Sequence, residues 1–73
     1  MKYAKVKYKG TSPLYTFKTN FNGLKQGESL LVEDIFGFSI VSFVQYTDEI
    51  PTFECRYILM REKEMKNLAR KYK

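Results

Sequence analysis

Few residues in this chain are of the types that carry out catalysis. Cys55 is the one thiol among 73 residues, and there is no histidine to activate it as a nucleophile. The alternating pattern around it places Cys55 with Phe53 and Tyr57 on an inward strand face, where burial raises the pKa of a thiol and makes it unreactive. One cysteine also excludes an internal disulfide and a zinc cluster. We therefore expect Cys55 to be structural.

Two pairs of adjacent carboxylates, Glu33-Asp34 and Asp48-Glu49, are the other candidates for chemistry. Neighbouring strand residues point to opposite faces, so neither pair forms a ready-made acid–base dyad. If the two turns lie close together they offer oxygen ligands to a hard cation, and the alternative is that both pairs are solvated turn residues. These patterns favour a binding protein over an enzyme, and we expect no cofactor and no metal.

Basic residues form a more promising pattern at the start of the chain. Lys5, Lys7 and Lys9 alternate with apolar residues, which places them about 6.5–7 Å apart on one strand face, close to the phosphate spacing of an extended nucleic acid. Such a row follows a phosphate backbone without reading its sequence. The alternative is that the lysines protect an exposed edge strand from pairing with other chains. An exposed edge here would also allow a homodimer through this strand.

The C-terminal segment, residues 61–73, is the second basic candidate. Met65, Leu68, Ala69 and Tyr72 recur at helical spacing, and most other positions are basic. Such a helix offers groups that bind phosphate and a tyrosine that stacks on a base. The alternatives are a helix docked on the domain with a solvated basic face, and a helix docked on a partner protein. The candidate nucleic-acid-binding residues are Lys5, Lys7, Lys9, Lys63, Lys66, Arg70, Lys71 and Tyr72.

Charge is organised along the chain in three blocks. Residues 1–25 contain six lysines and no acid, residues 26–55 contain six acids and no base, and residues 56–73 contain seven bases and two acids. The net charge of +5 therefore combines basic ends with an acidic middle. Because carboxylates repel phosphates, the acids must face away from the lysines if the ligand is a nucleic acid. Otherwise the partner is a protein of complementary charge.

Alternation and turn signals predict five short strands, near residues 3–9, 14–19, 30–32, 38–47 and 52–60. Gly37 is expected to take the positive φ of a tight hairpin at residues 34–37. The segment 38–47 is apolar on both faces, as in a strand covered on two sides. In the last strand Phe53, Cys55, Tyr57 and Leu59 are expected to point inward.

Strands of this length bury their inner faces best by curling into a small barrel. The predicted fold class is thus mainly β, a small five-stranded barrel with a C-terminal α-helix. Residues 1–60 form the barrel, and residues 61–73 form a basic amphipathic helix packed on the barrel or extending from it. We expect a single domain.

Residues 24–33, followed by Gly37 and the alternating segment 40–44, carry a family resemblance. The pattern resembles the start of SH3-like barrels of the KOW type, with Leu30 and Leu31 where valine is commoner. Together with residues 14–17, it is also similar to the N-terminal DNA-binding domain of the primosomal replication-restart helicase. The resemblance implies an SH3-like barrel and DNA binding.

The whole chain looks like small uncharacterised proteins of phages and prophages of Gram-positive bacteria, which often carry similar versions of segments 15–19 and 48–53. This resemblance implies a phage-encoded protein in the cytoplasm of the host cell. The start of the chain has no apolar signal sequence. The longest uncharged run, 35–47, is too short to span a bilayer, so a soluble cytoplasmic protein without membrane contact is expected.

The sequence therefore predicts a non-enzymatic binding module. The first hypothesis is nucleic-acid binding without sequence specificity, through the basic strand and helix faces. The alternative is a protein-binding accessory or inhibitor of a host or phage replication or transcription factor.

Overall fold

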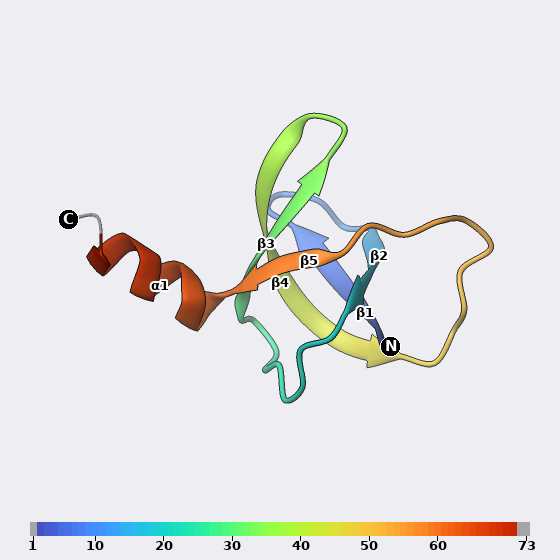
Figure 1. Ribbon diagram of the computed structural model, residues 1–73. Coiled ribbons are helices and arrows are strands. Elements are labelled where there is room, and N and C mark those ends of the chain that lie inside the picture. Colours follow the sequence, from blue (N-terminus) through green and yellow to red (C-terminus); the bar gives the residue numbers. More distant parts are fainter. Residues whose placement is uncertain (1, 72–73) are drawn as a thin grey trace.

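The computed structural model describes residues 2–71, which form five strands and one helix. The elements are β1 (Lys2–Tyr8), β2 (Leu14–Thr19), β3 (Ser29–Asp34), β4 (Gly37–Thr47), β5 (Ile58–Arg61) and α1 (Glu62–Lys71). The strands form one antiparallel sheet in the order β2-β1-β4-β3-β5, and the helix follows β5 directly (Figure 1). The predicted mainly β class with a C-terminal helix is confirmed.

The long strand β4 joins the two halves of the sheet. Its first half pairs with β3 and its second half pairs with β1. The pairing with β1 skips Val44, because Lys5 pairs with Gln45 and Val6 with Phe43, and such an extra residue bends a strand. Figure 1 shows β4 curving between the two halves, so that both halves face one core.

The two outer members of the strand order meet at one point. Lys18 of β2 and Tyr57 form an isolated parallel bridge, and the Lys18 amide donates a hydrogen bond of 2.9 Å to the carbonyl of Arg56. The predicted hairpin between β3 and β4 is also present, with Gly37 at a φ of 109°. Glycine adopts this conformation without the steric cost that a side chain would add.

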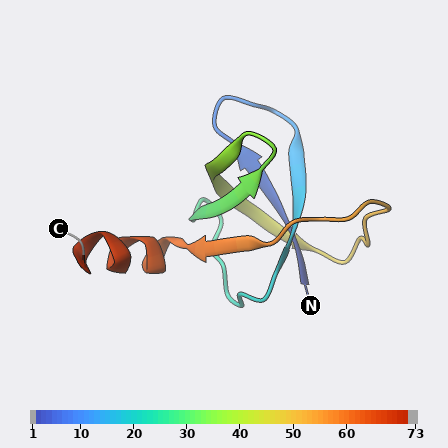
Figure 2. The ribbon, with the colours of Figure 1, turned by 45° about the horizontal axis from the view of Figure 1, so that its top comes forward.

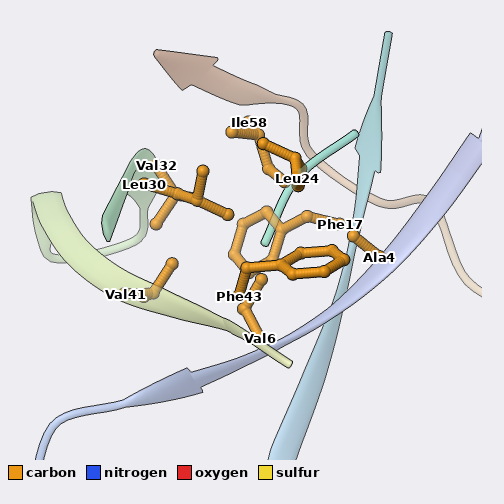
Figure 3. Close-up of a cluster of buried hydrophobic side chains, with 9 residues drawn as sticks. All are labelled: Ala4, Val6, Phe17, Leu24, Leu30, Val32, Val41, Phe43 and Ile58. Carbon is orange, nitrogen blue, oxygen red and sulfur yellow. The ribbon is translucent and has the colours of Figure 1, made fainter. Parts of the chain in front are cut away.

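The core lies inside the curled sheet and is small, as expected for a domain of this size (Figure 3). Leu30 and Val32 from β3 are completely buried, and so are Ala4 and Val6 from β1. The buried apolar cluster consists of Ala4, Val6, Phe17, Leu24, Leu30, Val32, Val41, Phe43 and Ile58. Each strand contributes at least one of these side chains, so the core forms only when the whole sheet is assembled.

The expectation that β4 is covered on two sides is wrong. Val41 and Phe43 are buried, but Phe38 and Ile40 on the other face are 69% and 52% exposed. The described chain has one sheet and one helix, and no residue of that helix is buried. There is consequently no second layer to cover the outer face of β4.

The expected strand over residues 52–60 is also wrong in its length and its phase. Regular pairing begins only at Ile58, and it is Ile58 that is buried, whereas Phe53 and Leu59 are exposed. The preceding residues form a loop that joins β2 where the Lys18 amide donates to the Arg56 carbonyl and Lys18 pairs with Tyr57. The shift in register between Leu31 and Val32 sets the phase of β5, and this tertiary pairing overrides the local alternation.

The first strand is not an edge strand, contrary to the alternative interpretation that its lysines protect an exposed edge. β1 pairs with β2 along one side and with β4 along the other. Both rows of backbone hydrogen-bonding groups are therefore used within the sheet. A second copy would pair with this strand only after β2 or β4 had left it.

The helix α1 projects away from the sheet in both views (Figures 1 and 2). Its first turn contains Glu62 and Glu64 and its last turn contains Arg70 and Lys71, an arrangement that suits the helix dipole. The Glu64 carboxylate also accepts the Arg61 amide at 3.1 Å, which caps the first turn. Within residues 2–71 no helix has the length and apolar character needed to cross a membrane.

The completely buried Leu30 offers a test of the small core. Leu30→Ala is expected to lower the free energy of unfolding by about 2–5 kcal/mol, because it removes buried methyl groups and leaves a cavity. Urea unfolding followed by circular dichroism measures the loss. Leu31→Ala is the matched control, because the neighbouring side chain is only partly buried on the opposite face. Equal losses for the two variants would contradict this description of the core.

Candidate functional site: an aromatic groove

Three separate segments of the chain line an open groove of about 820 Å³. They are residues 5–17 around the β1–β2 turn, the β3–β4 hairpin and the loop before β5. The lining residues are Lys5, Tyr8, Lys9, Thr11, Leu14, Tyr15, Thr16, Phe17, Asp34, Ile35, Phe36, Phe53, Glu54, Cys55 and Arg56. The fold brings these segments together, although their residues range from Lys5 to Arg56 in the sequence.

Aromatic rings are the main feature of this groove. Tyr15, Phe53 and Phe36 are 45%, 63% and 90% exposed, although each carries a large apolar ring. Tyr8 and Tyr15 pack edge to face, with ring centroids 5.1 Å apart and an interplanar angle of 81°. Exposed rings collected in one concave surface are typical of a binding site.

A hydrogen-bond network around Asp34 fixes one wall of the groove. The Tyr8 hydroxyl and the Ser39 hydroxyl donate to Asp34 Oδ2 at 2.9 and 3.1 Å, and the Phe36 amide donates to Asp34 Oδ1 at 2.8 Å. The hydrogen bond from the Phe36 amide is the main reason that the pKa of Asp34 lies below its usual value. Burial, supported by the bond to Asp34, raises the pKa of Tyr8 to about 12. The hairpin is thus tied to β1.

Charged side chains flank the rings. Lys5, Lys9 and Arg56 supply three cations, and Asp34 and Glu54 supply two carboxylates. Both oxygens of Asp34 already accept hydrogen bonds from within the protein, so this carboxylate is partly compensated. The groove therefore combines apolar rings with a small excess of positive charge.

Cys55 lies at the groove but is almost inaccessible. Its side chain is buried, as expected, and its Sγ lies 3.9 Å from the Phe53 carbonyl. Burial raises the pKa of the Cys55 thiol, while Lys18 and Lys5 oppose that shift. Cys55 stands outside the apolar cluster that forms the core. Burial and the raised pKa make the Cys55 thiol a poor nucleophile.

The fold separates the three lysines that were expected to form one row. Lys5 and Lys9 line the aromatic groove, whereas Lys7 is exposed outside it. The helix residues occupy another place. Lys63, Lys66 and Arg70 line a second, smaller hollow of about 530 Å³ with Lys25, Glu28, Arg61, Glu62 and Asn67. Lys71 is exposed at the end of α1, and Tyr72 lies outside the described residues.

The two basic segments do not form one surface in the described chain. The two hollows share no lining residue. In both ribbon views the helix and the loop formed by residues 48–57 project from opposite sides of the sheet (Figures 1 and 2). A ligand in the aromatic groove therefore contacts Lys5 and Lys9, and it contacts the helix only if it is long.

In the second hollow the Glu28 carboxylate is held in place by Arg61. Arg61 donates to both oxygens of Glu28, from Nε at 2.9 Å and from Nη2 at 3.2 Å, and the Arg61 hydrogen bond lowers the pKa of Glu28. Lys66 forms an ion pair with Glu62 at 3.2 Å, four residues away on the helix. These two carboxylates offset part of the positive charge in this hollow.

The sequence alone did not identify the ring-bearing residues of the groove. Phe53 is expected from its strand phase to point inward, and Tyr15 has the same phase as the buried Phe17, yet Tyr15 and Phe53 are both exposed. One signal was present, because Phe36 stands at the tip of a hairpin, where a large apolar ring has no core to enter. Arg56 gave no such signal.

Comparison with protein-family models, curated proteins and solved structures finds no match. Among residues 2–71, no group of three or more carboxylate or thiol side chains is arranged to hold a metal ion.

The burial of Tyr8 and its hydrogen bond to Asp34, which together raise the pKa of Tyr8, predict a specific loss of stability at high pH. The pKa of Tyr8 is raised above its ordinary value of 10.0 to about 12, so its contribution is complete below pH 10 and is lost as the pH rises through about 12. Tyr8→Phe is expected to remove this part of the pH dependence and to lower stability at neutral pH. Urea unfolding between neutral pH and pH 12 measures both effects. An unchanged pH profile in Tyr8→Phe would contradict the assignment.

Proposed function

We propose that this protein is a non-enzymatic module that binds single-stranded nucleic acid in the aromatic groove, without sequence specificity. The observation that carries the proposal is the convergence of three accessible rings and three cations on one open groove. Every base has an aromatic face, so stacking on Tyr15, Phe36 or Phe53 is independent of base identity. Cations beside the rings neutralise phosphates.

A single strand suits this groove better than a duplex does. The bases of a duplex are stacked on one another, whereas a single strand can present them to protein rings. The edge-to-face contact between Tyr8 and Tyr15 and the hydrogen bonds to Asp34 hold part of the groove wall in place before a ligand binds. Such preorganisation lowers the entropy cost of binding.

We also propose that the curled sheet is a small barrel. The contact between β2 and Tyr57 brings the two ends of the strand order together, which supports a small SH3-like barrel of the KOW type. This is the architecture of the helicase DNA-binding domain that the sequence resembles. Phage origin and a cytoplasmic location in the host are further parts of the proposal and depend on the sequence resemblance alone.

The remaining candidate residues act at a distance in this proposal. Lys7 is exposed near the groove, and the helix carries Lys63, Lys66, Arg70 and Lys71 on its surface. Exposed cations attract a polyanion and speed its association without defining where its bases lie. They also provide contacts for a nucleic acid that extends beyond the groove.

A protein ligand is the second candidate, and the carboxylates favour it. Asp34 and Glu54 line the same groove as the rings, and together they would attract a basic, extended peptide. This candidate is an accessory or inhibitor of a host or phage replication or transcription factor. The two candidates make opposite demands on the charges in the groove, so charge variants distinguish them.

The stacking contribution is tested with a fluorescently labelled mixed-sequence oligonucleotide and anisotropy. Phe53→Ala is expected to weaken binding by about 1–3 kcal/mol, the contribution of one stacked base. Phe38→Ala is the matched control, because that ring is similarly exposed but lies outside the groove. Equal affinities for the two variants, or no binding by the wild type at low salt, would rule out the groove as a nucleic-acid site.

The phosphate contribution is tested by the salt dependence of the same binding. For a single strand the logarithm of the affinity falls with the logarithm of salt concentration, with a slope of about −0.7 per phosphate neutralised. Lys5→Gln is expected to reduce that slope by about one such increment, and Lys7→Gln to change it much less.

Glu54→Gln distinguishes the two candidate ligands and is expected to strengthen nucleic-acid binding. If it abolishes capture of a basic peptide while oligonucleotides do not bind, the second candidate is correct.

A further inference from the structure

The strand β2 has a free backbone edge where it lines the aromatic groove. Its other side pairs with β1 along the whole strand. The Lys18 amide donates to the Arg56 carbonyl, so the backbone groups of Lys18 point away from β1. Groups two residues apart in a strand point the same way, so those of Leu14 and Thr16 also point away from β1. Within residues 2–71, these groups of Leu14 and Thr16 make no hydrogen bond.

The segment that faces this edge across the groove is held by few bonds. It belongs to the loop that projects from the sheet in both ribbon views (Figures 1 and 2). Within the described chain, no backbone amide of residues 50–55 donates a hydrogen bond. Ile50 and Phe53 are 78% and 63% exposed. A segment with so few bonds and so little burial changes conformation at small cost in free energy.

The contact between Lys18 and Tyr57 sets the register that this segment would take on β2. The bridge between these two residues is parallel, and the Lys18 side chain lies over the Tyr57 ring, 5.1 Å from its centroid. Counting back four residues on each segment places Leu14 opposite Phe53. The alternation over residues 52–60 is itself typical of a strand. Local sequence and the existing bridge therefore favour the same pairing.

Continuing the bridge in this register satisfies the free groups of both segments. In a parallel ladder, the Arg56 amide would donate to the Thr16 carbonyl, and the Thr16 amide to the Glu54 carbonyl. The Glu54 amide would then donate to the Leu14 carbonyl. None of these three bonds is present within residues 2–71 as the structure has them, so the pairing adds bonds without breaking a backbone bond of the loop.

We propose that residues 53–56 pair with the edge of β2 in this register and close that side of the aromatic groove. The structure then represents the open form, in which one bridge already holds the end of the seam. Closure brings together two walls that now line the groove. It also places Phe53 beside Leu14, on the face of β2 opposite to Tyr15, so the two rings no longer face one ligand.

Closure would make the groove self-regulating. A ligand between the two walls binds the open form only, and the closed form therefore lowers its apparent affinity by the fraction of molecules that are open. This effect on the ligand rests on the proposed function. The closure itself depends only on the backbone groups of β2 and of the loop.

Disulfide trapping tests the closed form and needs no ligand. Opposite residues of neighbouring strands lie about 4.8 Å apart, within the range of Cα separations that a disulfide spans. In a Cys55→Ser background, Leu14→Cys/Phe53→Cys is expected to form an internal disulfide at least about tenfold faster than Leu14→Cys/Glu54→Cys, because residue 54 points to the other face in this register. Circular dichroism confirms that both variants are folded. Equal rates, or no internal disulfide, would overturn the proposal.

Oligonucleotide anisotropy tests whether closure competes with the ligand. Glu54→Pro removes the amide that pairs with Leu14, and Glu54→Ala is the matched control that loses the same charge and keeps the amide. Glu54→Pro is expected to bind at least about twofold more tightly than Glu54→Ala, because it stays open. Equal affinities would reject the competition. If no variant binds oligonucleotide but the disulfide between positions 14 and 53 forms, the proposed function is wrong and the closure is supported.

Discussion

The paired hydrogen bonds between Arg61 and Glu28 are the interaction on which the arrangement of the chain depends. Arg61 lies where β5 ends and α1 begins, and it also donates to the carbonyls of Asn22 and Gly23. Both partners are largely withdrawn from solvent, with side-chain exposures of 27% and 12%, so a fork of this geometry is stronger than an exposed ion pair. It fixes one end of β5, and the contact of Arg56 with β2 fixes the loop before it. The direction of the helix follows from the Arg61–Glu28 contact, and the position of the loop that lines the groove follows from the contact of Arg56 with β2.

Much of the secondary structure could be predicted, because the local signals agree with the final pairing. The alternation around Ala4 and Val6 marks an inner face that the structure buries, and Phe17 has the same phase in β2. Alternation failed in the segment before Ile58, because an apolar period of two describes a loop over a sheet as well as it describes a strand. It also gave no information on strand order, so the position of β1 between β2 and β4 was not foreseen.

The groove was harder to foresee than the fold, because its rings belong to segments that are distant in sequence. Tyr15, Phe36 and Phe53 come together only through the curvature of the sheet and the path of one loop. The basic residues were found, since lysine spacing is a local property, but the sequence did not show that Lys5 and Lys9 share a groove that excludes Lys7. Nor did it show that the helix lies on the other side of the sheet, away from the loop before β5.

The pairing of β1 with β4 has a consequence for how the chain acquires its structure during synthesis. Tyr3 pairs with Thr47 and Tyr8 with Val41, so the first strand has its full set of partners only when β4 has left the ribosome. Until then the β1–β2 hairpin has little core to bury and is marginally stable. Contacts between distant residues also slow folding, because a long loop must close before they form. The nascent chain therefore exposes Val6 and Phe17, which the folded chain buries, and it is at this stage that chaperones have most to recognise.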